Sequence, residues 1–185
     1  MTPVQYGNLT QLLMMPEETE AIVAAIKAMP SDGVMVEWGS GGSTCKWLDT
    51  MSNQQRLITV EHNIEWFSTV KDSIEKHFGN ISNKFQFHHV PEEPGYVHGY
   101  GQIEEENPFG LAKYICPTKD IYDGDLYFVD GIARGACVAA ILVNRRKQNS
   151  RIFVHDFVPR YNAYNWISQF CTLTQYGATL VELKF

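Results

Sequence analysis

The chain has 185 residues and a formal net charge of −6, from 15 Lys and Arg against 21 Asp and Glu. Its 44% of hydrophobic and 19% of charged residues are ordinary for a globular protein, and the length suits one domain, 1–185, with a substantial core. The negative charge argues against nucleic acid or an anionic membrane surface as the main partner. No run approaches the ~18 apolar residues of a membrane span, and the N-terminus lacks a secretory pattern.

The predicted elements of the first half alternate between helix and strand. Pro16 and the acids after it favour the first turn of a helix, which Pro30 ends. Short apolar runs predict strands, and periodic apolar residues predict helices between them. The expected strands are 34–38, 57–61 and 85–90, and the expected helices are 45–51 and 64–78, the latter capped by Asn63.

A long irregular segment, 91–121, follows, rich in Pro and Gly, with helical turns expected at 109–115. This segment is either a disordered surface insertion or a functional loop whose aromatic residues form a lid or an acceptor pocket; these residues are Tyr96, His98, Tyr100, Phe109 and Tyr114. Tyr161 and Tyr164, after the fifth strand, would complete the wall. Strands are then expected at 126–130, 152–156 and 179–185, and helices at 136–143 and 162–170. This alternation predicts a three-layer α/β/α sandwich around a mainly parallel, doubly wound sheet, with an antiparallel C-terminal strand.

The strands end in residues that we expect to meet at one edge of the sheet, because right-handed crossovers bring all parallel strand ends together. These residues are Glu37, Glu61, Val90, Asp130 and Asp156. Several carboxylates at the ends of buried strands are costly without a partner, so they indicate a ligand.

The glycine-rich loop Gly39-Ser40-Gly41-Gly42-Ser43-Thr44 stands between a predicted strand and a helix. It is either an ordinary turn or a loop whose backbone approaches a ligand closely. Thr44 replaces the third glycine of a dinucleotide fingerprint, and the loop lacks the lysine of a nucleoside-triphosphate loop. Glu37 would repel a pyrophosphate and suits a cationic ligand, while Glu61 can accept hydrogen bonds from ribose hydroxyls or be an exposed acid.

These motifs resemble those of class I, Rossmann-like S-adenosylmethionine-dependent methyltransferases, in order and over nearly the whole chain. The resemblance rests on the segments 34–44, 60–62, 129–134 and 154–157. It implies S-adenosylmethionine as cofactor, with the methionine part held by Glu37 and loop 39–44, and the ribose by Glu61. His62 or Trp66 would flank the adenosine, although Trp66 alternatively packs on its helix face. Since no acid follows the third strand, Val90, Pro91 or Glu92 would contact the adenine.

The acceptor end of the site is expected to hold Asp130, Arg134, His155 and Asp156. Asp130 orients the acceptor, contacts the cofactor, binds a metal or caps the next helix. Arg134 clamps a carboxylate or phosphate of the substrate, or forms an ion pair with Asp130 or Asp156. His155 is a general base or a structural hydrogen-bonding group, and adjacent strand residues point to opposite faces unless the strand has ended. Asp130 and Asp156 resemble a divalent-metal pair, but a third oxygen ligand is not evident, so no metal is expected.

The sequence therefore predicts a methyltransferase for a small-molecule or sugar-like acceptor, acting on oxygen. Two alternatives are a non-catalytic adenosyl-binding module and a nucleotide- or nicotinamide-dependent enzyme on a similar sheet. The cysteines Cys45, Cys116, Cys137 and Cys171 are far apart and predict reduced thiols in the cytoplasm.

Overall fold

The computed structural model describes residues 13–93 and 108–185. Tyr96, His98 and Tyr100, expected in a lid or an acceptor pocket, and the side chain of Phe109 lie outside the described part. The longer helices are α1 (Pro16–Ala28), α2 (Gly42–Thr50), α3 (Ile64–Phe78) and α6 (Arg134–Asn144), and the short ones are η1 (Pro108–Leu111), α5 (Ala112–Ile115), η2 (Lys119–Asp123), α7 (Tyr161–Tyr164) and η3 (Asn165–Gln169). The strands are β1 (Val34–Trp38), β2 (Arg56–Glu61), β3 (Phe85–His89), β4 (Leu126–Val129), β5 (Arg151–Val154), β6 (Thr172–Tyr176) and β7 (Leu180–Lys184).

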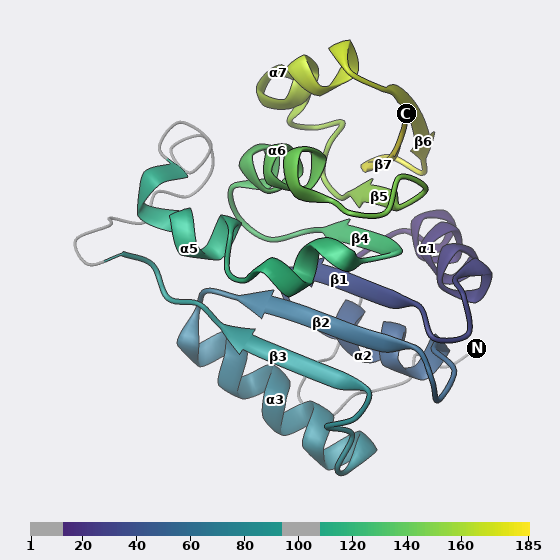
Figure 1. The fold of residues 1–185 in the computed structure, drawn as a ribbon, viewed down its shortest axis with the longest axis vertical. Helices are drawn as coiled ribbons and strands as arrows, with labels where there is room; N and C mark the ends of the chain where they lie inside the picture. Colours follow the sequence, from purple (N-terminus) through teal and green to yellow (C-terminus); the bar gives the residue numbers. More distant parts are fainter. Residues whose placement is uncertain (1–12, 94–107) are drawn as a thin grey trace.

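Seven strands form one sheet in the order β3-β2-β1-β4-β5-β7-β6 (Figure 1). Pairs among β1 to β5 are parallel, whereas β7 runs antiparallel to both β5 and β6. The expected doubly wound sheet with an antiparallel C-terminal strand is therefore confirmed. The strand order reverses between β1 and β4, which is where open α/β sheets bind their ligands.

Helices cover both faces of the sheet, and strand side chains alternate between these two layers. Val34, Val36 and Trp38 of β1 belong to the core beneath α5, α6 and η3, and Met35 belongs to the core beneath α1, α2 and α3. Glu37 shares the parity of Met35. It therefore points toward α2, as its contacts with that helix show below.

Local sequence signals explain most element boundaries. The Asn63 side chain accepts a hydrogen bond from the Trp66 backbone N–H at 2.9 Å, which confirms the predicted cap of α3. The helix predicted at Cys45 instead begins at Gly42, inside the glycine loop. Ile64, the first residue of α3, is 55% exposed, whereas Val70 and Ile74 of the same helix are buried.

All four cysteines are free thiols, as predicted, with Cys45 and Cys137 buried. Within 13–93 and 108–185, no helix has the length and apolar character to cross a membrane.

Candidate active site

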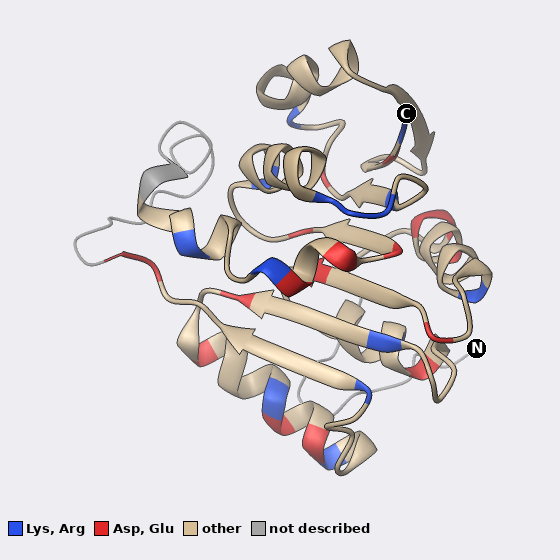
Figure 2. Cartoon of the chain, viewed as in Figure 1, with Lys and Arg blue, Asp and Glu red and all other residues tan. Residues whose placement is uncertain are grey.

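A cavity of about 730 Å³ opens where β1 and β4 end. Glu61 is the last residue of β2, Asp130 directly follows β4, and acidic residues stand at these two tips on one edge of the sheet (Figure 2). The volume lies within the range of about 300–1,000 Å³ of small-molecule sites. Its lining comprises Gly39, Ser40, Glu61, His62, Asn63, Glu65, Trp66 and Thr69 on one side and Asp130, Gly131, Ile132, Arg134 and Arg160 on the other.

Two glycines bring the chain segments after β1 and β4 into backbone contact. Gly39 has a φ of +87°, and a Cβ there would lie 2.6 Å from both Cα and N of Gly131. A Cβ on Gly131 would in turn collide with the hydroxyl of Tyr114. Both positions therefore require glycine for steric reasons, and they close the floor between the two loops.

Glu37 lies beneath the glycine loop and does not line the cavity. Its carboxylate is fully buried and accepts hydrogen bonds from the hydroxyls of Ser43, Thr44 and Thr59 and from Nε1 of Trp47, at 2.8–3.0 Å. Burial raises the pKa of Glu37 to about 7, although the three hydroxyl hydrogen bonds act in the opposite direction. The group thus ties β1, β2 and the start of α2 together.

Glu61 holds the tip of the same loop from the neighbouring strand. Its Oε2 accepts hydrogen bonds from both the backbone N–H and the hydroxyl of Ser40, each at 2.9 Å. Its Oε1 accepts the backbone N–H groups of His62 and Asn63, also at 2.9 Å. Burial alone would raise the pKa of Glu61, but these hydrogen bonds and the adjacent His62 ring lower it. Glu61 therefore presents an ionised carboxylate at the cavity.

Two rings stand on this side of the cavity. The indole Nε1 of Trp66 donates to the carbonyl of Ser40, and the ring remains 43% exposed. Trp66 thus lines the cavity rather than packing on the helix face. The His62 ring lies 3.0 Å from Glu61 Oε1 and 3.7 Å from Glu92, and makes an edge contact with Tyr114. Glu92, one of the three residues considered for the adenine contact, thus lies beside a cavity-lining ring.

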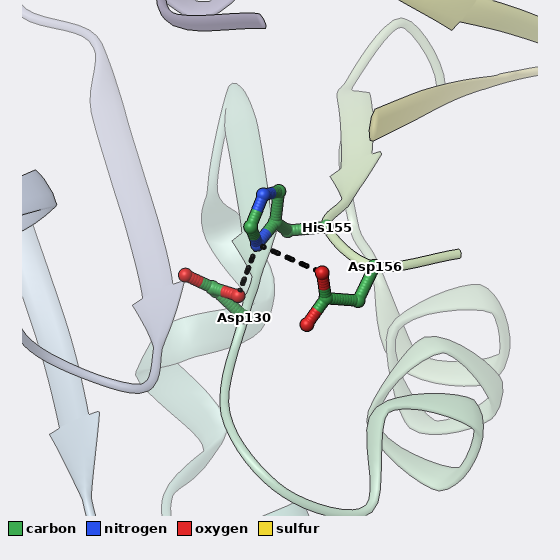
Figure 3. A group of neighbouring side chains, drawn as sticks. All are labelled: Asp130, His155 and Asp156. Atoms are coloured by element: carbon green, nitrogen blue, oxygen red, sulfur yellow. Dashed lines mark hydrogen bonds and ion pairs between the residues drawn. The ribbon is translucent and has the colours of Figure 1, made fainter. Parts of the chain in front are cut away.

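On the other side, Asp130, His155 and Asp156 converge (Figure 3). Nδ1 of His155 lies 2.7 Å from Oδ1 of Asp130 and 3.8 Å from Oδ1 of Asp156. Because β5 ends at Val154 and Asp156 has a φ of +52°, adjacent side chains can both turn toward Asp130. Burial would lower the pKa of His155, but the two carboxylates raise it overall, which favours the imidazolium.

Arg134, at the start of α6, is the buried cation of this cluster. It donates to the backbone carbonyls of Asp130, Gly131 and His155 at 2.8–3.0 Å and to Oδ2 of Asp156 at 2.8 Å. Of the two roles expected for Arg134, its contacts therefore show the ion pair. Since its guanidinium already neutralises the carboxylates, the three potential ligand groups of Asp130, His155 and Asp156 offer a poor site for a divalent cation.

Glu18 of α1 also belongs to this cluster, and its contact with His155 was not predicted from the sequence. Its Oε2 lies 3.6 Å from Nε2 of His155, and its Oε1 accepts the N–H and hydroxyl of Thr179 and the N–H of Leu180. Glu18 is 1% exposed; burial would raise its pKa, but these hydrogen bonds and that of the Met15 N–H lower it. The only sequence signal was an acid in the first turn of a helix, which normally indicates a dipole interaction.

The expected strand-end residues thus separate into two groups. Glu61 and Asp130 line the cavity, with Gly39, Ser40 and His62, whereas Glu37, Val90 and Asp156 are not among the lining residues. Gly41, Gly42, Ser43 and Thr44 form the junction of loop and α2 just beneath. Of the aromatic residues expected at the acceptor end, Tyr114 and Tyr164 are fully buried in the core, and Tyr161 is 48% exposed.

No protein-family model and no curated protein matches the chain. Solved structures do match. A methyltransferase-like protein from Silicibacter pomeroyi aligns with a TM-score of 0.72 and 19% identity, over 94% of this chain and 87% of that chain. An O-methyltransferase from Bacillus cereus, solved with S-adenosylhomocysteine, gives 0.63 and 14% over 96% and 85%. Precorrin-6Y C5,15-methyltransferase from Geobacter metallireducens gives 0.58 and 14% over 94% and 89%.

The chain therefore has the fold of class I S-adenosylmethionine-dependent methyltransferases, as the sequence motifs predicted. At these identities the likeness establishes the fold, and activity has to be argued from the site itself.

Proposed function

We propose that the protein is an S-adenosylmethionine-dependent methyltransferase that methylates an oxygen of a small-molecule acceptor. The observation that carries the proposal is the pairing of the glycine loop with the ionised carboxylate of Glu61, over a cavity at the strand-order reversal. The match to solved methyltransferases, one of them an O-methyltransferase solved with S-adenosylhomocysteine, supports it.

The residues on the β2 side fit the donor. The Ser40 hydroxyl on Glu61 Oε2 occupies a position that a ribose hydroxyl can take, because both are donors to the same carboxylate oxygen. The Gly41 backbone is open: a Cβ there would approach Trp66 and Ser43 only to 3.8 and 4.0 Å. Glu61, held by neutral hydrogen-bond donors and kept ionised, supplies a negative charge that favours a cationic sulfonium compound over a pyrophosphate.

Glu37, which lies beneath the glycine loop, contributes to the donor site indirectly. Its four hydrogen bonds fix Ser43, Thr44 and Trp47 of α2 against β1 and thereby set the position of the glycine loop. We therefore assign to Glu37 an indirect role in holding the methionine part, through the loop that it orders.

Bound S-adenosylmethionine supplies an electrophilic methyl group on a sulfonium sulfur. Asp130 is the group best placed to act on the acceptor, since its Oδ1 is held by His155 while its Oδ2 makes no hydrogen bond within the described residues. We assign to Oδ2 the binding of the acceptor hydroxyl and removal of its proton. His155, whose Nε2 faces Glu18, orients Asp130 rather than contacting the acceptor.

Isothermal titration calorimetry with S-adenosylhomocysteine tests the donor assignment. Glu61→Ala is expected to weaken binding by more than tenfold, because it removes a charged acceptor of hydrogen bonds. Glu75→Ala, on the outer face of α3, is the matched control and should bind like the wild type. Circular dichroism establishes whether each variant is folded, and Glu61→Gln replaces Glu61→Ala if the latter unfolds.

The outcomes separate the candidate functions. Unchanged affinity in a folded Glu61 variant contradicts the donor site. Binding of NAD in place of S-adenosylhomocysteine would establish the nicotinamide alternative. Tight donor binding without methyl transfer to any of a broad panel of hydroxyl compounds would establish the non-catalytic binding module.

A further inference from the structure

Arg160 is the one cavity-lining arginine that has no hydrogen bond or ion pair from its side chain to any residue in 13–93 or 108–185. Its charge lowers the pKa of Asp156, but that carboxylate is bonded to Arg134. Arg134, the other lining arginine, is 7% exposed and donates to Asp156 and to backbone carbonyls. A guanidinium at a cavity wall with its donors available is suited to bind a ligand.

The backbone that carries Arg160 is held in place. Its N–H donates to the carbonyl of Phe157 at 3.1 Å, and its carbonyl accepts the N–H of Ala163 at 2.9 Å. Phe157 is 1% exposed, and its N–H donates to the carbonyl of Thr179 at 2.9 Å. Arg160 therefore projects from an anchored turn at the start of α7, which lowers the entropy cost of binding.

Three carboxylates in or beside the cavity already have partners other than the Arg160 side chain. Asp156 already pairs with Arg134 at 2.8 Å, and Asp130 is held by His155 at 2.7 Å. Glu61, across the cavity, accepts hydrogen bonds from Ser40 and backbone groups. Each of these three carboxylates thus has a partner, and an added anion would complete the charge pairing at Arg160.

We propose that Arg160 binds an oxyanion, a carboxylate or a phosphate, of the molecule that enters the cavity from the β4–β5 side. This inference rests on the proposed function in identifying that molecule as the methyl acceptor. The oxyanion would lie at the rim formed by Arg160 and Ile132, and the hydroxyl to be methylated would face Asp130. The substrate class is then a hydroxylated small molecule with an acidic group.

Binding of matched probes, followed by ¹⁹F NMR on protein saturated with S-adenosylhomocysteine, tests the inference. The probes are 4-fluorobenzoate, 4-fluorophenyl phosphate and the neutral 4-fluorobenzyl alcohol. We expect at least one anion to bind about 10- to 100-fold more tightly than the alcohol, as charge-assisted hydrogen bonds imply. The comparison of the two anions identifies whether carboxylate or phosphate is preferred.

Three variants test whether the preference for the anion depends on Arg160. Arg160→Ala should remove the preference for the anion, and Arg160→Lys should retain part of it, since a lysine keeps the charge but not the bidentate fork. Arg146→Ala, at an exposed arginine beyond the C-terminal end of α6, is the matched control and should leave the preference intact. Equal binding of alcohol and anions by the wild type, or an anion preference that survives in Arg160→Ala, overturns the inference.

The affinity for S-adenosylhomocysteine is measured in the same samples. If the wild type fails to bind it, the proposed function fails, and the probes titrated against the free protein still report on Arg160. If it binds equally to wild type and Arg160→Ala while the anion preference is lost, the oxyanion site is distinct from the donor site.

Discussion

The two halves of the cavity hold their carboxylates in different ways. On the β1–β2 side, Glu37 and Glu61 accept hydrogen bonds mainly from neutral groups, namely hydroxyls, an indole and backbone N–H groups. On the β4–β5 side, Asp130 and Asp156 face the charged groups of Arg134 and His155. The β1–β2 side is therefore a dipolar half, in which neutral hydrogen-bond donors surround the carboxylates next to the glycine loop. The β4–β5 side is an ionic half, in which the carboxylates pair with charged groups.

The difference follows from what each half has to bind. A cationic donor requires carboxylates whose charge is not cancelled, and neutral hydrogen-bond donors stabilise a carboxylate while leaving its net charge in place. An acceptor group that loses a proton requires a carboxylate fixed in position, and ion pairs from two sides provide that restraint. On the proposed function, the first half therefore selects ligand charge and the second sets geometry.

The glycine contact between the halves should give the largest effect. Gly39→Ala is expected to lower the free energy of unfolding by about 2 to 6 kcal/mol, from left-handed strain and from overlap with Gly131. Gly79→Ala is the control, because Gly79 has a φ of +68° but no atom lies within 4 Å of the place that a Cβ would take. It should cost about 1 to 3 kcal/mol, from backbone strain alone. Urea unfolding measures both, and equal losses would show that the close approach is not what requires glycine.

Asp130→Asn tests the ionic half. We expect turnover on the acceptor found in a hydroxyl-compound panel to fall by about 10²- to 10⁴-fold, as for loss of a general base, with little change in donor affinity. The pKa of His155, followed by NMR of its ring, should fall, because burial lowers it and the Asp130 carboxylate no longer opposes burial. Asp32→Asn, at an exposed site before β1, is the control. A His155 pKa unmoved in Asp130→Asn would contradict the coupling.

Glu37→Gln tests the dipolar half, and near neutral pH it should have the smallest effect of the three substitutions. In the folded protein the pKa of Glu37 is about 7, against 4.5 for an ordinary glutamate, so the folded state holds an extra proton between these values. The contribution of Glu37 to stability is therefore complete below pH 4.5 and is lost as pH rises toward 7. The free energy of unfolding of the wild type, minus that of the variant, should fall by about 1.4 kcal/mol per pH unit in this range. A difference that does not vary with pH would show that Glu37 is ionised throughout.

The fold and the dipolar half could be predicted from the sequence because their signals are local. The run Val34–Trp38 followed by glycines defines both a strand and the loop after it, and Glu61 follows from the end of the next strand. The face that Glu37 occupies was missed, although the alternation of Met35 and Glu37 within β1 gives it. Strand-end position alone does not distinguish a cavity residue from one beneath it.

The ionic half was only partly predictable because its contacts join distant parts of the chain. Asp130, Arg134, His155 and Asp156 were identified, but their pairing depends on where β5 ends. Glu18 reaches His155 only after α1 packs near the start of β7, and nothing in its local sequence indicates that contact. Arg160 likewise becomes relevant only once the turn after β5 is placed at the cavity.

The contact of Gly39 with Gly131 has a consequence for how substrate range can change. Main chain, rather than side chains, forms the floor of the cavity there, so substitutions cannot deepen it without separating β1 from β4. Mutant libraries aimed at larger or smaller acceptors should therefore vary Ile132 and Arg160, whose side chains line the cavity, and leave both glycines fixed.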